Sequence, residues 1–391
     1  MPEVDAVIVG GGLSGLSLAA HLAANGWGDR SVLVVDDPRV RPSAVSWGFW
    51  SAEPGLLGAA ASRTYEQVRV HTAGTSHLLP LGRYRYRVVQ RPDLRTAVHT
   101  ILGQAPGFRF LDGHAEQVYD DGDSACVTVD NHTIRCGWAF DSVTAPPAGS
   151  PADARLAFAG WEIRCARPVF DPATPVLFDF RTPQAGGSRF VYILPDDPYR
   201  ALVELTEFVP RRARPPSLVE RHTALAEYLT TVLHCGDYHI SRAESAVLAL
   251  RTHPTRRATG RVLAIGASAG LVKASTGYAY QRIQQDSAAI TKSLVQFGHP
   301  FSIRPTRRRY RLLDAVLLDV LDRDPPQLEL AFDRLFEANP ADRVLRFLDE
   351  DSSPMDVLRL MASLPPAPYL RALALLHCGP RTVPAGTGKS G

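Results

Sequence analysis

Arg261-Val-Leu-Ala-Ile-Gly-Ala-Ser-Ala-Gly-Leu-Val-Lys-Ala-Ser-Thr-Gly-Tyr-Ala-Tyr-Gln-Arg-Ile-Gln284 is the stretch of sequence that decides the fold. The apolar run from Val262 to Ile265 predicts a strand, which leads into small residues, a polar turn and then a helical pattern. Small residues let the backbone approach a bulky ligand, and the N–H groups at a helix start suit anionic oxygens. The candidate cofactor contacts in this stretch are Gly266, Gly270, Ser275, Thr276 and Gly277.

A second glycine-rich turn opens the chain, in Val4-Asp-Ala-Val-Ile-Val-Gly-Gly-Gly-Leu-Ser-Gly15. A buried strand is predicted before the glycines and a helix after them. In this pattern Gly10 makes the tight turn, Gly12 lets the backbone approach a pyrophosphate, and Gly15 allows the helix to pack closely on the strand. Together the two segments predict one large dinucleotide held from both ends of the sequence, which is typical of FAD proteins.

Acidic and basic residues near this turn are candidates for the rest of the dinucleotide site. The apolar run Ser31 to Val35 predicts a second strand, which ends in Asp36 and Asp37. A carboxylate at this distance from the glycines accepts hydrogen bonds from ribose hydroxyls. Either aspartate fits, and the strand register favours Asp36. Arg91 and Arg95 open a predicted helix and are candidates for the flavin phosphates, with ordinary surface charge as the alternative.

Composition is typical of a cytoplasmic enzyme. The 391 residues suffice for two lobes and a sizeable core, and a net charge of +3 is too small to favour nucleic acid as a partner. Five scattered cysteines without metal-ligand spacing predict free thiols and no metal site. The N-terminus lacks the basic region of a signal peptide, and no run reaches ~18 apolar residues, so neither secretion nor a membrane span is expected.

The predicted fold class is α/β (α+β), a Rossmann-like FAD-binding domain of the hydroxylase type that carries an inserted antiparallel sheet. We expect the FAD-binding domain over residues 1–150 and 255–300. Aromatic and β-branched runs between turn residues predict the substrate sheet over residues 151–254. A Leu-rich helical region is expected over 301–380, followed by a disordered tail over 381–391.

The chain resembles the bacterial flavin-dependent lycopene cyclases from Val4 to about Leu376. The resemblance rests on the glycine-rich opening, the Gly266 to Gln284 segment and several strand motifs. General flavin hydroxylases usually carry an aspartate where this chain has Ala267. The strand motifs that carry the resemblance include Ser46-Trp-Gly-Phe-Trp50, Gly160-Trp161, Phe190-Val-Tyr-Ile-Leu-Pro195 and Ala201-Leu-Val-Glu-Leu-Thr206.

The resemblance implies that the end group of an acyclic polyene is cyclised without net oxidation, as by an intramolecular lyase or isomerase. A proton is delivered to a terminal alkene, the neighbouring alkene attacks the cation, and a proton is lost. The resemblance further implies that reduced FAD acts as an electron-rich partner beside the cation, with NAD(P)H as a candidate external reductant.

Glu204 falls where this family carries its catalytic glutamate. Alkenes are weak bases, so the acid must be neutral, and burial in an apolar pocket raises the pKa of a carboxyl group. Strand alternation leaves open which face of the Glu204 strand points inward, so a surface carboxylate is the alternative, with Glu207 the next candidate acid. Aromatic faces could stabilise a cation, and the candidate pocket residues are Trp47, Phe49, Trp161, Tyr192 and Tyr278.

Departures from the family pattern keep three functions open. Gly48 stands where a Cys is usual, Ala274 where many relatives have Pro, and Ser245 to Leu250 lacks the usual Ile-Pro-Met. The first function is a carotenoid end-group cyclase. The second is a cyclase or isomerase of the same fold that acts on another terpenoid or specialised metabolite. The third is a flavin monooxygenase, against which Ala267 and the Glu204 strand argue.

A hydrophobic polyene substrate resides in the bilayer, so peripheral association with the inner face of the plasma membrane is expected. Met355 to Leu376 predicts two short apolar helical pieces, broken at Pro365 to Pro368. Arg359 and Arg371 could reach lipid head groups while apolar side chains enter the interface. The alternative is a helical pair that covers the core.

Overall fold

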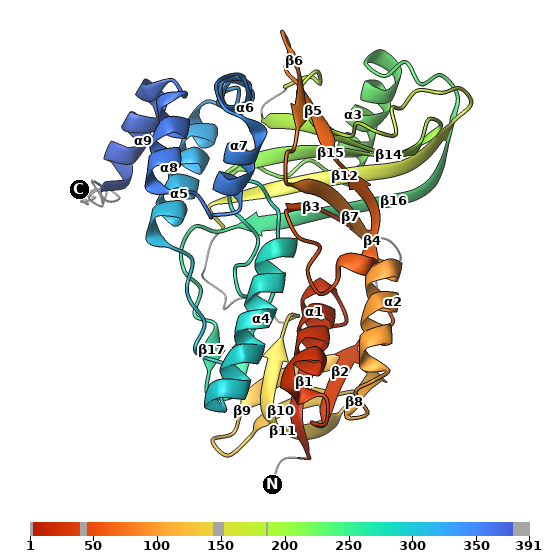
Figure 1. Ribbon diagram of the computed structural model, residues 1–391, viewed down its shortest axis with the longest axis vertical. Helices are drawn as coiled ribbons and strands as arrows, with labels where there is room; N and C mark the ends of the chain where they lie inside the picture. The colour runs from red at the N-terminus through yellow and green to blue at the C-terminus, as the bar shows by residue number, and fades with distance from the viewer. Residues whose placement is uncertain (1–2, 40–44, 144–151, 185–186, 378–391) are drawn as a thin grey trace, which may run out of the picture.

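Two large β-sheets form the body of the molecule, and they lie one above the other along its longest axis (Figure 1). The computed structural model describes residues 3–39, 45–143, 152–184 and 187–377. The predicted tail at 381–391 and Cys378 lie outside these residues. The other four cysteines are buried and free.

The lower sheet holds the first glycine-rich turn. Its central strands are parallel and buried on both faces. This burial explains why their sequences are continuous runs of Val, Ile and Ala rather than alternating apolar and polar residues. The last parallel strand comes from residues 262–264 and pairs with the sheet formed by the N-terminal region. From edge to edge the strands are β17 (Ala258–Thr259), β18 (Val262–Ala264), β11 (His132–Asp141), β1 (Val4–Val9), β2 (Val32–Asp36) and β8 (Phe108–Asp112), with β10 (Ala125–Val129) beside β11 and β9 (Ala115–Asp120) beside β10.

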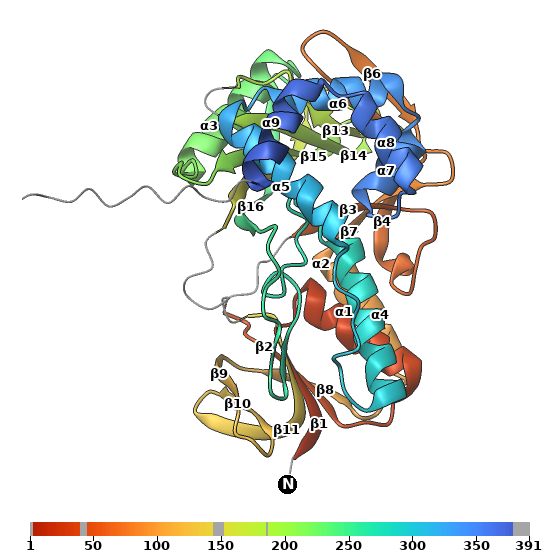
Figure 2. The ribbon, with the colours of Figure 1, turned by 90° about the vertical axis from the view of Figure 1, so that its left-hand side faces the viewer.

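Three helices pack beside this sheet: α1 (Leu13–Leu22), α2 (Arg91–Leu102) and α4 (Tyr280–Phe297) (Figures 1 and 2). Leu16, Leu18 and Leu22 of α1 are fully buried. The helix α4 follows the second glycine-rich stretch and lies against α1, so the two dinucleotide segments are neighbours in space. A π-helical turn, Ala23–Trp27, extends α1.

The upper sheet is mostly antiparallel and includes the strands expected for the inserted sheet at residues 151–254. Two of its strands come from residues 67–80, within the range expected for the FAD-binding domain, because alternating Val68 and Val70 can pack in either sheet and sequence does not choose the partner. Its order is β16 (Tyr238–Leu250), β12 (Ala154–Cys165), β15 (Arg200–Pro210), β14 (Ser188–Asp197), β13 (Val176–Asp179), β5 (Gln67–His71) and β6 (Ser76–Pro80).

A small sheet joins the two layers. Its strands are β3 (Ser46–Ser51), β7 (Arg85–Gln90) and β4 (Ala61–Tyr65), and a short 3-10 turn, Gly58–Ala60, leads into β4. One face of the upper sheet is covered by α3 (Leu218–Thr231), which begins with a capping box between Ser217 and Glu220.

The C-terminal helices cover the other face of the upper sheet. Phe332 packs on Phe178 with ring centroids 4.4 Å apart, which joins the helical region to the sheet core. Among the helices of the described residues, none combines the length and apolar character needed to cross a bilayer. The C-terminal helices are α5 (Arg308–Arg323), α6 (Gln327–Ala338), α7 (Ala341–Leu348), α8 (Pro354–Ala362) and α9 (Pro366–His377).

The architecture confirms the predicted fold class. It combines a parallel Rossmann-type sheet, a largely antiparallel second sheet and a helical C-terminal region.

Candidate functional site

The N-terminal glycines make a tight turn between β1 and α1. Gly10 has φ +102°, and a Cβ on Gly15 would overlap the carbonyl oxygen of Gly10. A Cβ on Gly12 would meet no atom within 4 Å, so this glycine faces open space. Since Gly12 is also the N-cap of α1 and has no capping side chain, the first turn of that helix suits an anionic group.

Asp36 lies at the end of β2, directly against this turn. Its Oδ1 accepts from the N–H of Gly11 at 3.1 Å, and its side chain is buried. Arg91 Nη2 lies 3.5 Å and Arg95 Nη1 lies 3.6 Å from Asp36 Oδ2. Asp37 instead holds Arg39 through a pair of hydrogen bonds. The register therefore places Asp36, rather than Asp37, against the glycine turn, with Arg91 and Arg95 beside it.

The second glycine-rich stretch closes over the start of α1. A Cβ on Gly266, which has φ +67°, would overlap Ser14 Oγ. Gly277 has φ +76°, and its Cβ would overlap Leu156 of the upper sheet. Gly270 also has positive φ, and Ser275 and Thr276 are buried. The residues predicted to hold a dinucleotide thus form one cradle, with open space at its centre beside Gly12.

A cavity of about 590 Å³ extends from this cradle to the face of the upper sheet. Leu13, Ser14 and Ala267 line its lower end. Thr276 and Gly277 also contribute to its wall. The far wall includes Leu156, Leu202, Glu204, Thr206 and Glu244.

The structure decides which face of β15 points inward. Leu202, Glu204 and Thr206 line the cavity, whereas Val203 and Leu205 pack in the core beneath α3. Glu207 does not share the Glu204 face, and it forms an ion pair with Arg189. Burial raises the pKa of Glu204 well above its usual value, and the nearby Glu244 raises it further. Glu204 thus faces the cavity in surroundings that favour the neutral form of its carboxyl group.

Glu244 is a site residue that the sequence analysis did not identify. It lies on β16, lines the same cavity, and shares a hydrogen bond with Glu204. Its Oε2 accepts from the N–H of Ser46 at 3.2 Å and lies 3.5 Å from Arg242 Nη1. Glu244 lies two residues after Arg242 and next to Ser245, so sequence does not distinguish it from a surface charge, and the pairing depends on a register that sequence does not give.

The aromatic candidates separate into three places. Trp47, Tyr192 and Tyr278 line the cavity as predicted, together with Tyr86, which was not predicted. The Tyr86 and Tyr278 hydroxyls lie 3.5 Å apart. A Cβ on Gly48 would overlap the Tyr86 hydroxyl, which gives a physical reason for glycine at this position.

Two predicted pocket residues lie outside this cavity. Trp161 packs on the opposite face of the upper sheet, with its ring centroid 5.1 Å from that of His222, because it is the strand neighbour of the inward-facing Gly160. The prediction that Trp161 lines the substrate pocket is corrected accordingly. Phe49 stacks on Tyr280 at 3.9 Å and faces a smaller neighbouring pocket.

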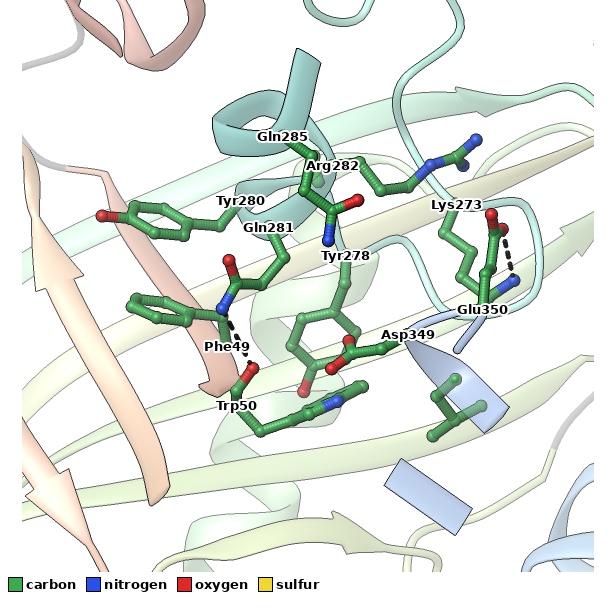
Figure 3. A pocket seen from close by; sticks show the side chains of 12 residues that line it. Phe49, Trp50, Lys273, Tyr278, Tyr280, Gln281, Arg282, Gln285, Asp349 and Glu350 are labelled. Atoms are coloured by element: carbon green, nitrogen blue, oxygen red, sulfur yellow. Dashed lines mark hydrogen bonds and ion pairs between the residues drawn. The ribbon is translucent and has the colours of Figure 1, made fainter. Parts of the chain in front are cut away.

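That smaller pocket lies where the second glycine-rich stretch meets the C-terminal helices (Figure 3). Lys273 Nζ lies 3.1 Å from Asp314 Oδ1 and 3.0 Å from Glu350 Oε1, and all three side chains are largely buried. Burial raises the pKa of the nearby Asp349 to about 8. These ion pairs tie the turn at residues 273–277 to α5 and to the end of α7.

Replacing Lys273 with methionine is expected to lower the free energy of unfolding by about 3–5 kcal/mol, because Asp314 and Glu350 would lose their buried cation. Urea denaturation measures the change. Lys292→Met, at an exposed position on α4, is the matched control and should cost less than ~0.5 kcal/mol. Equal stability of the two variants would show that the buried cluster does not hold the turn.

Comparisons with known proteins agree with this geometry. A family model described as "Lycopene cyclase protein" matches residues 5–374. A protein of Deinococcus radiodurans named "Uncharacterized carotenoid cyclase" is 25% identical over 316 residues, covering 74% of this chain and 70% of that protein.

Solved structures with the same fold include several flavoproteins. A geranylgeranyl bacteriochlorophyll reductase-like protein from Thermoplasma acidophilum matches with a TM-score of 0.63 at 12% identity, covering 94% of this chain and 98% of that one. A flavoprotein/dehydrogenase from Cytophaga hutchinsonii gives 0.63 at 12% identity, covering 96% and 99%. HpxO from Klebsiella pneumoniae, complexed with FAD, gives 0.60 at 14% identity, covering 93% and 100%.

Proposed function

The chain belongs to the lycopene cyclase protein family, and from this premise we propose that it cyclises the end group of an acyclic polyene such as lycopene. The observation that carries the proposal is Glu204, a half-buried acid on the wall of the cavity, whose raised pKa favours its neutral form. The cavity starts at the dinucleotide cradle, so substrate end group and flavin would meet inside it. A neutral acid shielded from bulk water is what protonation of an alkene requires.

The proposed reaction balances without an oxidant. Glu204 gives its proton to a carbon of the terminal alkene, whose π electron pair forms the new C–H bond. The electron pair of the neighbouring alkene then forms the ring C–C bond, and the positive charge moves to the ring. A ring C–H bond breaks, its electron pair becomes the ring double bond, and the proton returns to the Glu204 carboxylate. Substrate and product are isomers.

FAD is the cofactor that the cradle fits. The glycine turns leave space for a pyrophosphate beside Gly12, and Asp36 would accept from the ribose. Bound in its reduced form, FAD would supply an electron-rich ring next to the cation, with NAD(P)H as the proposed external reductant. Trp47, Tyr192 and Tyr278 would exclude water and present aromatic faces, each worth ~0.5–2 kcal/mol to a desolvated cation.

The test of this proposal has two arms. Expression in lycopene-producing cells should yield cyclic pigments that are absent from cells carrying Glu204→Gln. The purified protein with reduced flavin should convert lycopene without oxygen. Because a flavin monooxygenase needs dioxygen, turnover only in air would favour that alternative.

A second candidate function is cyclisation or isomerisation of a different terpenoid. Gly48, Tyr86, Ser245 and Leu248 line the cavity. Gly48 and the segment from Ser245 to Leu250 are both departures from the usual family pattern. Flavin that binds and reduces normally, without conversion of lycopene, would favour this candidate. A panel of shorter prenyl compounds would then identify the substrate.

We also propose that the outer faces of α8 and α9 dock on a lipid surface to collect a hydrocarbon substrate. Leu360 is fully buried, so the inner face of α8 covers the core. The outer faces expose Leu358 at 63%, next to Arg359 in sequence, and Leu370 at 62%, next to the exposed Arg371. Apolar side chains beside a cation suit the boundary between acyl chains and anionic head groups.

Flotation with liposomes tests this docking surface. The native chain should float with vesicles that contain anionic lipid, and Leu358→Asp/Leu370→Asp should remain in the aqueous fraction with unchanged thermal stability. Leu218→Asp/Val219→Asp, at exposed positions on α3, is the matched control and should still float. Native protein that stays in the aqueous fraction would contradict membrane docking.

A further inference from the structure

Two glutamates meet across a glycine on the cavity face of the upper sheet. Gly160 of β12 is the register partner of Glu204 on β15 and also of Glu244 on β16. Neighbouring strands lie ~4.8 Å apart, so the two glutamate backbones are roughly 10 Å apart with β12 between them. A Cβ on Gly160 would lie 3.1 Å from Glu204 Cβ and 3.3 Å from its Cγ. Glycine therefore leaves the gap across which the two carboxyl groups share a hydrogen bond.

The groups around Glu244 stabilise its negative charge. The N–H of Ser46 donates to its Oε2, and Arg242 lies beside the same oxygen. Arg242 is held in place by Glu162, with Nε 2.8 Å from Glu162 Oε2, and by a hydrogen bond of 3.0 Å to Ser46 Oγ. Burial raises the pKa of Glu244 overall, with a smaller contribution from Glu162, whereas Arg242, the hydrogen bond with Glu204 and the Ser46 N–H lower it.

The surroundings of Glu204 favour its neutral form. Burial and Glu244 raise its pKa, and they outweigh the hydrogen bond that Thr206 Oγ1 donates to its Oε1 at 3.3 Å, which lowers the pKa. Tyr86, Tyr192 and Tyr278 line the same cavity. Glu244 faces it as a like charge. Two carboxyl groups within hydrogen-bond distance do not both ionise readily, so the pair holds one proton. The cation lies on the Glu244 side, and the proton therefore resides on Glu204, which donates to Glu244.

We propose that Glu244 is a positioning residue that keeps the proton of the pair on Glu204 and returns it there after each turnover. The catalytic part of this inference rests on the proposed cyclisation. When Glu204 gives its proton to the alkene, the Glu244 carboxylate lies near the developing cation. It also raises the proton affinity of the Glu204 carboxylate, which favours recovery of the proton from the ring. Gly160 is needed for this pairing, because a side chain there would separate the two carboxyl groups.

Glu244→Gln tests the proposal through the pH dependence of turnover. Glutamine has no charge and can donate an N–H to Glu204, which favours the ionised form of Glu204. We expect the alkaline limb of the rate profile to move to lower pH. The rate of turnover should fall roughly tenfold or more at the upper end of the native pH plateau and only a few-fold at acidic pH. Glu227→Gln, at an exposed position on α3, should keep the native profile. A uniform loss at every pH, with normal flavin content, would overturn the proposal.

An infrared titration provides a readout that needs no substrate. Asp349, whose pKa is raised to about 8, should contribute a carbonyl band of its own, so an Asp349→Asn background isolates the signal of the pair. In that background the protein should show the carbonyl band of a protonated carboxyl group at neutral pH, and Glu204→Gln should remove it. In Glu244→Gln the band should disappear at lower pH than in the native protein. A band that keeps its full intensity in Glu204→Gln in the Asp349→Asn background, or a titration unchanged by Glu244→Gln, would overturn the shared-proton pair. If the native protein shows the expected band but does not convert lycopene, the proposed substrate is wrong and the pair stands.

Gly160→Ala provides a second variant that retains both carboxyl groups. Its Cβ would force the Glu204 side chain to shift by a few tenths of an ångström. The band should then titrate at lower pH, as in Glu244→Gln. A native titration in a folded Gly160→Ala protein would contradict the role of the gap.

Discussion

Glu204→Gln is expected to lower the rate of cyclisation by ~100- to 10,000-fold, the usual cost of losing a positioned general acid. The amide has nearly the shape of the protonated carboxyl group, so the cavity should keep its form. It cannot give a proton to an alkene. The measurement is single-turnover conversion of lycopene with reduced flavin under anaerobic conditions, with flavin content determined for each preparation.

The pH dependence of stability separates the chemical effect from damage to the fold. The pKa of Glu204 is raised in the folded protein, so its contribution to stability is complete below the ordinary glutamate pKa and is lost as pH rises through the raised value. Glu204→Gln lacks this loss and should be at least as stable as the native protein at alkaline pH. Turnover within about threefold of native would place the acid elsewhere, and lower stability at high pH would contradict burial of the carboxyl group.

Features of this site that depend on residues close together in the sequence could be predicted, whereas features that depend on distant residues could not. The glycine turns and Asp36 are set by a strand, a turn and a helix that are contiguous in sequence, so their spacing was informative. The inward face of β15 required the register with β12 and β14, which sequence left open. The incorrect placement of Trp161 has the same cause, since a shift of one position along β12 moves a side chain from the cavity to the core beneath α3.

Glu244 and the buried Lys273 cluster show a second limit of prediction from sequence. Each depends on side chains from elements far apart in the chain, such as Lys273 with Asp314 and Glu350. No local pattern distinguishes these charges from ordinary surface residues. The two strands at residues 67–80 lie in the range expected for the FAD-binding domain but pair with the upper sheet, because alternation predicts a strand without naming its partner.

Gly12→Val is expected to weaken FAD binding by roughly 10- to 100-fold or more, equivalent to the ~1–3 kcal/mol that extra methyl groups cost in a close-packed site. The protein itself should tolerate the change. Gly12 has φ −87° and ψ −167°, which any residue adopts, and a Cβ there meets no protein atom within 4 Å. The open space beside Gly12 is where we place the pyrophosphate, so the new side chain would collide with the ligand alone.

Titration of the apoprotein with FAD, followed by flavin fluorescence, measures this effect. Gly74→Val is the matched control, because Gly74 is exposed and its Cβ would also meet no atom within 4 Å. Both variants should unfold at the native temperature without flavin, and only Gly12→Val should lose the stabilisation that bound FAD gives. Gly15→Ala should behave differently, with loss of stability even in the apoprotein, since its Cβ would overlap the Gly10 carbonyl oxygen. Native affinity in Gly12→Val would mean that the pyrophosphate does not approach this turn, and the proposed cofactor placement would be wrong.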